Sequence, residues 1–133
     1  MVLNERSRDR LQGVHPKLVA VVKLAATMVP TPGGLAFIVT EGLRTQERQK
    51  QLVQAGASRT MASRHLTGHA VDLAATVSGE VRWDWPLYIE LAMVMGKAAE
   101  SLGVALTWGG SWKSFPDGPH FEINPETYPW PKS

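Results

Sequence analysis

The sequence predicts a small α+β domain in which helices pack against a mainly antiparallel sheet. Three observations support this class: stretches with apolar residues at helical spacing, short β-branched or aromatic segments between turn residues, and the lack of a regular strand–helix alternation. A regular alternation would favour a doubly wound parallel sheet instead. With 133 residues, of which 44% are hydrophobic and 20% charged, the chain is expected to form one domain over residues 1–133.

Three helices are predicted. From Pro16 to Val29, apolar residues recur every three or four positions before a Pro-Thr-Pro-Gly-Gly run ends the helix. The polar segment from Gln46 to Gln54 follows Thr45, which is a good N-cap residue. The longest helix is expected from Trp85 to Leu102. Its predicted buried stripe comprises Tyr88, Leu91, Ala92, Met95, Ala99 and Leu102.

The strands are predicted from short β-branched and aromatic runs. They are expected at Leu35–Thr40, His69–Ala75, Val104–Trp108 and Pro119–Ile123, with a further strand or turn near Val81–Trp83. On the second of these strands Ala70, Asp72 and Ala74 would share one face, so the carboxylate would project into open space. On the last strand His120 and Glu122 would point away from the core.

Composition excludes several classes of protein. The chain has no cysteine, so it forms neither disulfides nor the thiolate-rich sites typical of structural zinc. The net charge is +2, and no arginine or lysine cluster is dense enough to indicate nucleic-acid binding. No apolar run reaches membrane-spanning length, so we expect no membrane insertion. The first ten residues are charged and lack the apolar core of a secretory signal, which predicts synthesis in the cytoplasm without a signal peptide.

Two histidines and an aspartate indicate a catalytic zinc site. His65 and Asp72 lie seven positions apart, and His120 follows much later in the chain. Two imidazoles and one carboxylate can hold Zn²⁺ while one coordination position stays open for water. Asp117, in a Pro-Asp-Gly turn before His120, could then take a proton from that water.

Each of these residues also has a simpler explanation. A single histidine is more often structural than a ligand, and we expect this of His15 and His69. Asp117 alone would be a turn residue. Glu122, on the strand face of His120, could be the base instead, or could orient that imidazole.

Three motifs resemble the D-alanyl-D-alanine carboxypeptidase and L-alanyl-D-glutamate peptidase family, the VanY-like and phage endolysin group. The first is Ser-x-His-x-x-Gly-x-Ala-x-Asp from Ser63 to Asp72. The second is Trp-Gly-Gly-Ser-Trp-Lys-Ser-Phe-x-Asp-x-Pro-His-Phe from Trp108 to Phe121. The third is Glu-Gly-Leu-Arg-Thr from Glu41 to Thr45, followed after two residues by Arg48 and Gln49. They occur in the order found in the family and lie within residues 35–123. Ser111 and Leu43 differ from the aspartate and the aromatic residue common in the family, which puts substrate preference in doubt rather than hydrolysis.

The resemblance implies a Hedgehog/DD-peptidase-like fold and a role for each matching residue. Zinc would be bound by His65, Asp72 and His120. Asp117 would be the catalytic acid-base residue. Arg44 would bind the substrate or its developing oxyanion, and Ser63 would hydrogen-bond the substrate. The tryptophans Trp108 and Trp112 could line the groove, although packing is the commoner role for such residues.

The expected function is that of a small endolysin, a zinc peptidase that cuts the stem peptide of bacterial peptidoglycan between L-alanine and D-glutamate. We expect a monomer without a separate wall-binding domain, which would reach the cell wall after release from the host cytoplasm. Two alternatives remain: a D-alanyl-D-alanine carboxypeptidase or dipeptidase, and a non-catalytic wall-binding module of the same fold. Zinc could also serve only to hold the fold, but a domain of this size can bury a core without it.

Overall fold

The computed structural model describes residues 2–58 and 61–129. Residues 130–133, which belong to the predicted domain, lie outside this range. In chain order the elements, with η for a 3-10 helix, are α1 (Glu5–Arg10), α2 (Pro16–Thr27), β1 (Leu35–Glu41), α3 (Gln46–Gln54), η1 (Arg64–Thr67), β2 (Ala70–Val77), β3 (Glu80–Arg82), α4 (Trp85–Leu102), β4 (Leu106–Trp108), η2 (Gly109–Ser111) and β5 (His120–Ile123).

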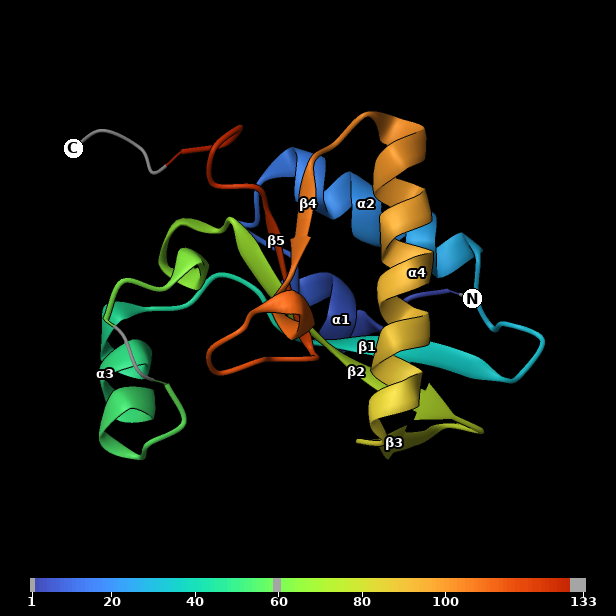
Figure 1. Ribbon diagram of the computed structural model, residues 1–133, viewed down its shortest axis with the longest axis horizontal. Helices are drawn as coiled ribbons and strands as arrows, with labels where there is room; N and C mark the ends of the chain where they lie inside the picture. Colours follow the sequence, from blue (N-terminus) through green and yellow to red (C-terminus); the bar gives the residue numbers. More distant parts are fainter. Residues whose placement is uncertain (1, 59–60, 130–133) are drawn as a thin grey trace.

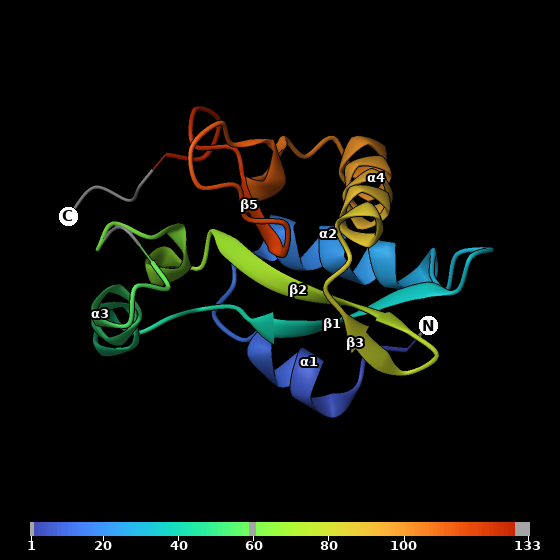
Figure 2. The same ribbon diagram turned by 60° about the horizontal axis from the view of Figure 1, so that its bottom comes forward.

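The strands form one sheet in the order β1-β2-β5-β4, with β3 paired to β2. The β1–β2, β2–β3, β2–β5 and β4–β5 pairs are all antiparallel. Helices α2 and α4 cover one face of the sheet and α1 lies against the other, whereas α3 stands beyond the end of β1 (Figures 1 and 2). The predicted α+β class and antiparallel sheet are therefore confirmed.

The core lies between the sheet and the helix pair α2 and α4. Its fully buried large side chains include Leu18, Phe37, Leu73, Tyr88, Leu91, Met95 and Phe121. The predicted stripe of α4 is wrong at Leu102, which is 44% exposed. This residue lies in the last turn, where α4 extends past α2 (Figure 1). Val94 and Ala98 are buried instead.

Helix α1 was not predicted, because Glu-Arg-Ser-Arg-Asp-Arg contains no apolar residue to reveal a helical period. Asn4 caps this helix by accepting a hydrogen bond from the Ser7 amide at 2.8 Å. Polar contacts hold α1 to the sheet: Ser7 Oγ accepts from the Val39 amide at 3.0 Å, and Arg10 Nη1 donates to the Val39 carbonyl at 3.0 Å. These contacts lie just before the irregularity at the end of β1.

A β-bulge lengthens β1 by one residue beyond the predicted end. The register with β2 shifts between Val39 and Glu41, which leaves Thr40 as the extra residue and places Glu41 opposite Asp72. The bulge thus directs the Glu-Gly-Leu-Arg motif toward the carboxylate on β2. None of the helices within residues 2–58 and 61–129 is both long and apolar enough to span a bilayer.

Candidate metal centre and active site

His65, Asp72 and His120 converge at one end of the sheet. Asp72 on β2 lies directly opposite His120 on β5, and His65 comes from η1, which leads into β2. Asp72 Oδ1 lies 3.2 Å from His65 Nε2 and 3.4 Å from His120 Nδ1. One ligand atom from each residue lies within 4.8 Å of the others. The three predicted ligands are therefore close enough to share a single cation.

The first motif owes its spacing to the short helix η1. Ser63 caps the helix, its Oγ accepting from the His65 amide at 3.2 Å. Gly68 ends it in the left-handed region at φ 73°. A Cβ at Gly68 would lie 2.3 Å from the Gly13 carbonyl oxygen, so no other residue fits there. The serine and glycine of the motif therefore fix the position of His65.

Hydrogen bonds on the far side of each imidazole fix which nitrogen faces Asp72. His65 Nδ1 lies 2.8 Å from the Gly42 carbonyl oxygen, which can only accept, so Nδ1 carries the proton. His120 Nε2 likewise lies 2.8 Å from Glu122 Oε1. Each bond leaves the other nitrogen, His65 Nε2 and His120 Nδ1, free to bind a metal. This is the usual environment of ligating histidines.

Glu122 is buried between His120 and Arg64. Its Oε2 lies 3.5 Å from Arg64 Nε. Arg64 also donates to the Ile123 carbonyl at 2.9 Å and to the Tyr128 carbonyl at 2.6 Å, so it ties η1 to β5. Of the two roles considered for Glu122, the geometry favours orienting the imidazole. Arg64 was not among the predicted site residues, because an arginine beside a histidine is most simply a surface residue.

Arg44 is buried and its guanidinium is surrounded by acceptors. It makes bonds of 2.9 and 2.6 Å to Glu41, 2.7 Å to Gln49 Oε1, 3.5 Å to Ser63 Oγ and 3.4 Å to Asp72 Oδ2. A guanidinium has five N–H donors, and these contacts engage all of them. In this arrangement Arg44 holds Asp72 in place and has no donor left for a substrate. Gln49, which the third motif contains but to which no role was assigned, is fully buried and links Arg44 to Ser58 through a 2.8 Å bond.

Asp117 lies at the end of a closed loop beside the cluster. The Gly109 carbonyl accepts from the Trp112 amide at 3.2 Å and from the Asp117 amide at 3.0 Å, which pins both ends of this loop. The Asp117 carboxyl shares a cavity of about 510 Å³ with the three predicted ligands, Arg44 and Ser63. Burial and the nearby Asp72 raise the pKa of Asp117. The carboxyl is thus suited to exchanging a proton nearer neutral pH.

The charges in the cluster call for a cation. Burial opposes ionisation of Asp72, but hydrogen bonds from His120 and His65 outweigh it and hold the pKa of Asp72 well below its usual range. Burial would also lower the pKa of His120, yet the Asp72 and Glu122 carboxylates raise it to about 9. A proton on His120 therefore supplies positive charge where a divalent ion could sit. The donor set of two imidazoles and a carboxylate fits Zn²⁺.

The remaining histidines lie apart from the cluster. The rings of His15 and His69 are 5.5 Å apart, and the Tyr128 ring lies 5.8 Å from His15. His15 Nδ1 caps α2 by accepting from the Lys17 amide at 3.1 Å. This contact gives His15 a structural role, as predicted.

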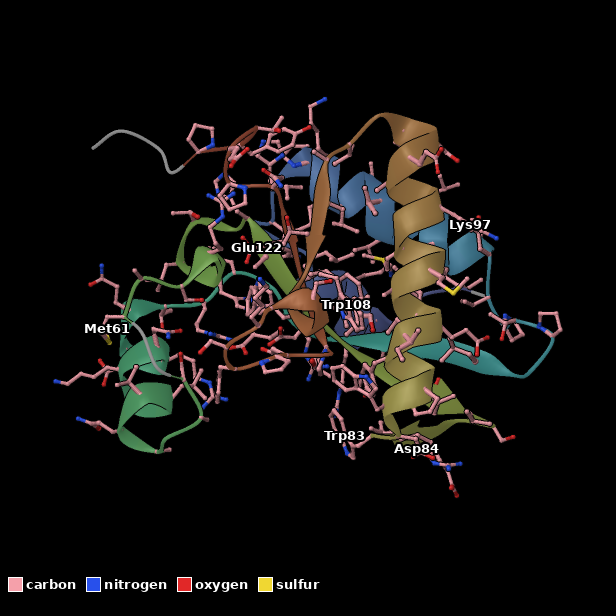
Figure 3. The ribbon with its side chains drawn as sticks, viewed as in Figure 1. Met61, Trp83, Asp84, Lys97, Trp108 and Glu122 are labelled. Atoms are coloured by element: carbon pink, nitrogen blue, oxygen red, sulfur yellow. The ribbon has the colours of Figure 1, made fainter. Side chains whose placement is uncertain are left out.

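The two tryptophans of the second motif have different surroundings. Trp108 donates its indole N–H to the Gly118 carbonyl at 2.7 Å and stacks on Trp85 with centroids 5.7 Å apart. In Figure 3 Trp108 lies between η2 and α4, whereas Glu122 lies on the side of η2 that faces η1. Trp112 instead lines the cavity, with its ring 4.9 Å from that of His120. Trp108 therefore has a packing role, whereas Trp112 lies in the groove.

Comparisons with known proteins agree with these motifs. The family model for phage L-alanyl-D-glutamate peptidases matches residues 1–131. The L-alanyl-D-glutamate peptidase of Listeria phage A118 is 38% identical over 96 residues, which are 71% of this chain but only 33% of that protein. The chain thus spans about a third of the length of that relative.

Two further relatives match along most of their length. The L-alanyl-D-glutamate peptidase of Escherichia phage T5 is 29% identical over 128 residues, 93% of this chain and 90% of that protein. The crystal structure of the Serratia marcescens L-Ala D-Glu endopeptidase ChiX has a TM-score of 0.85 and 46% identity, covering 95% of this chain and 92% of that one. The chain therefore belongs to the phage L-alanyl-D-glutamate peptidase family.

Proposed function

We propose that the chain is a zinc-dependent endopeptidase that hydrolyses the L-alanyl-D-glutamate bond in the stem peptide of bacterial peptidoglycan. One observation carries this proposal: His65, Asp72 and His120 converge within 4.8 Å in the cavity that Asp117 also lines. The relatives are named as peptidases of the L-alanyl-D-glutamate bond, which supports the choice of this bond. Because a further relative, CwlK of Bacillus subtilis, is named a peptidoglycan L-alanyl-D-glutamate endopeptidase, the bacterial cell wall is the proposed place of action.

In the proposed reaction zinc would be held by His65 Nε2, a carboxylate oxygen of Asp72 and His120 Nδ1. When bound, the metal supplies Lewis-acid polarisation of the scissile carbonyl and acidifies the attacking water. The Asp117 carboxylate takes the proton from this water and delivers it to the amine of D-glutamate as that amine leaves. Burial of Asp117 raises its pKa, so the protonated form needed for the second step is accessible.

The surrounding residues position these groups. Glu122 accepts a hydrogen bond from His120 Nε2–H, and the Gly42 carbonyl accepts one from His65 Nδ1–H, so both imidazoles keep the required tautomer. Arg44 fixes the second oxygen of Asp72. The substrate-binding roles expected for Arg44 and Ser63 stay predictions, and in the case of Arg44 they require that a substrate carboxylate displace one of its present acceptors.

The test combines metal analysis with product identification. Purified protein should bind one zinc per chain and release a free D-glutamyl amine from a muramoyl-L-alanyl-D-glutamyl peptide, as measured by mass spectrometry. Asp117→Asn should keep the zinc but lower kcat by about 10² to 10⁴. Release of a single D-alanine would favour the carboxypeptidase alternative. Wall binding without any cleavage would favour the non-catalytic alternative.

A further inference from the structure

Phe115 has a backbone conformation that is rare for a bulky residue. Its φ is 55°, in the left-handed region. The only other non-glycine residue with positive φ within residues 2–58 and 61–129 is Ser78, at φ 53°. Ser78 and Gly79 form the two-residue turn between β2 and β3, where positive φ is usual. Phe115 lies in no such hairpin, so its conformation calls for another explanation.

The side chain of Phe115 is also unusually exposed. It is 44% exposed, although burying a phenylalanine is strongly favourable. The ring lines the cavity that holds Asp117 and the three predicted metal ligands. Phe115 belongs to the loop that the Gly109 carbonyl closes, and this loop reaches from η2 toward α3 (Figure 1). Strained backbone combined with an exposed aromatic ring is typical of a residue that a functional site requires.

The aromatic and charged residues lie on different elements around this cavity. Trp112 and Phe115 come from the loop before β5, next to Asp117. Glu41 and Arg44 come from the end of β1, across the predicted ligands. The two sides of an L-alanyl-D-glutamyl bond differ in the same way, because alanine offers a methyl group and glutamate a carboxylate. An apolar surface favours the methyl group, whereas the Arg44 guanidinium can meet the carboxylate only in place of one of its present acceptors, Glu41 or Asp72.

We propose that Phe115 and Trp112 form the subsite for the alanyl side chain, on the acyl side of the bond, and that Phe115 determines the preference for alanine. This subsite rests on the proposed function and adds substrate selection to it. The ring of Phe115 would cover the methyl group, and the positive φ sets the direction in which this ring projects from the loop. Trp112 would form the adjacent wall beside His120.

The test compares two substrates that differ by one methyl group. A muramoyl peptide with L-alanyl-D-glutamate and its glycyl analogue are given to the zinc-loaded wild type and to Phe115→Asn, since asparagine tolerates positive φ but removes the ring. One methyl group in an apolar pocket changes kcat/KM by about 10-fold or more. The wild type should show this preference, Phe115→Asn should lower the ratio to about 1 or 2, and Phe115→Leu should retain most of it.

Ser78→Asn is the matched control, because it places the same residue at the other positive-φ position, in the turn between β2 and β3. It should leave the substrate ratio unchanged. An unchanged ratio in Phe115→Asn would overturn the subsite, and so would equal losses on both substrates, which would mean that Phe115 only positions Asp117. If the zinc-loaded wild type does not cleave the alanyl substrate, the proposed function itself is contradicted. This outcome differs from failure of the subsite alone, in which the wild type still cleaves that substrate.

Discussion

Gly109 is the position where one added methyl group tests the catalytic geometry most directly. A Cβ at this residue would lie 2.6 Å from the Asp117 carbonyl oxygen and 2.9 Å from His120 Cβ. The Asp117 carbonyl would have to move by about 0.8 Å, from 2.6 Å to the 3.4 Å at which ordinary contact begins. Because the Gly109 carbonyl also closes the loop, the shift cannot be absorbed without disturbing Asp117 or His120. Gly109→Ala therefore displaces a proposed acid-base residue relative to a proposed ligand.

The expected loss of activity is large and the loss of stability moderate. Misplacement of a catalytic group by about 1 Å costs about 10²-fold in rate, so kcat/KM of Gly109→Ala should fall by about that factor. Overpacking of a tight site costs about 1–3 kcal/mol, which should lower the free energy of unfolding by that amount. Activity should be measured on a defined muramoyl peptide at saturating zinc, and stability by denaturant unfolding.

Gly96→Ala is the control for this experiment. Gly96 lies within α4, a Cβ added there would meet nothing within 4 Å, and its φ is not positive. Alanine there should keep full activity and raise the free energy of unfolding by about 0.5–1 kcal/mol. If Gly109→Ala keeps kcat/KM within about threefold of the wild type while folding normally, the loop does not position Asp117 relative to His120.

Three other outcomes are expected. His65→Ala and His120→Ala should lose the zinc that His15→Ala and His69→Ala retain, and elemental analysis of the purified variants decides this. Chelation should abolish activity but leave the native circular dichroism spectrum, because the core is complete without metal; unfolding on chelation would mean that zinc is structural. In the metal-free protein the raised pKa of His120 stabilises the fold, and this stabilisation is complete below pH 6.5. About 3 kcal/mol of the free energy of unfolding is lost as pH rises to about 9. The melting temperature of the metal-free protein should therefore fall over that interval, while that of the zinc form does not.

Local patterns predicted the helices well. Gln46–Gln54 and Trp85–Leu102 have the bounds expected from capping residues and apolar spacing. The convergence of Asp72 with His120 also followed from the motifs, since both were placed on strands. Short elements such as α1 and η1 were missed, because fewer than two helical turns show no clear period.

The roles of Arg64 and Gln49 were not predicted, because both depend on polar contacts that the local sequence does not reveal. The acceptors of Arg64, the Ile123 and Tyr128 carbonyls, lie about sixty positions along the chain and leave no pattern near the arginine. Gln49 belongs to the third motif, but its helix has no other buried residue, so the sequence around it does not identify Arg44 and Ser58 as its partners. Such contacts depend on backbone groups and amides, which every segment contains, so only the folded chain identifies the partners.

The role of Arg44 follows from one irregularity in the sheet. Had β1 kept its register, Glu41 would lie opposite Val71, whose side chain is fully buried in the core. The extra residue Thr40 instead sets Glu41 opposite Asp72, so two carboxylates share one face of the sheet. Like charges this close destabilise each other, and Arg44 offsets the repulsion by bridging both, at 2.6 Å and 3.4 Å. The bulge therefore commits the guanidinium to holding Asp72, the proposed metal-binding carboxylate, so a substrate can bind Arg44 only by competing with that contact.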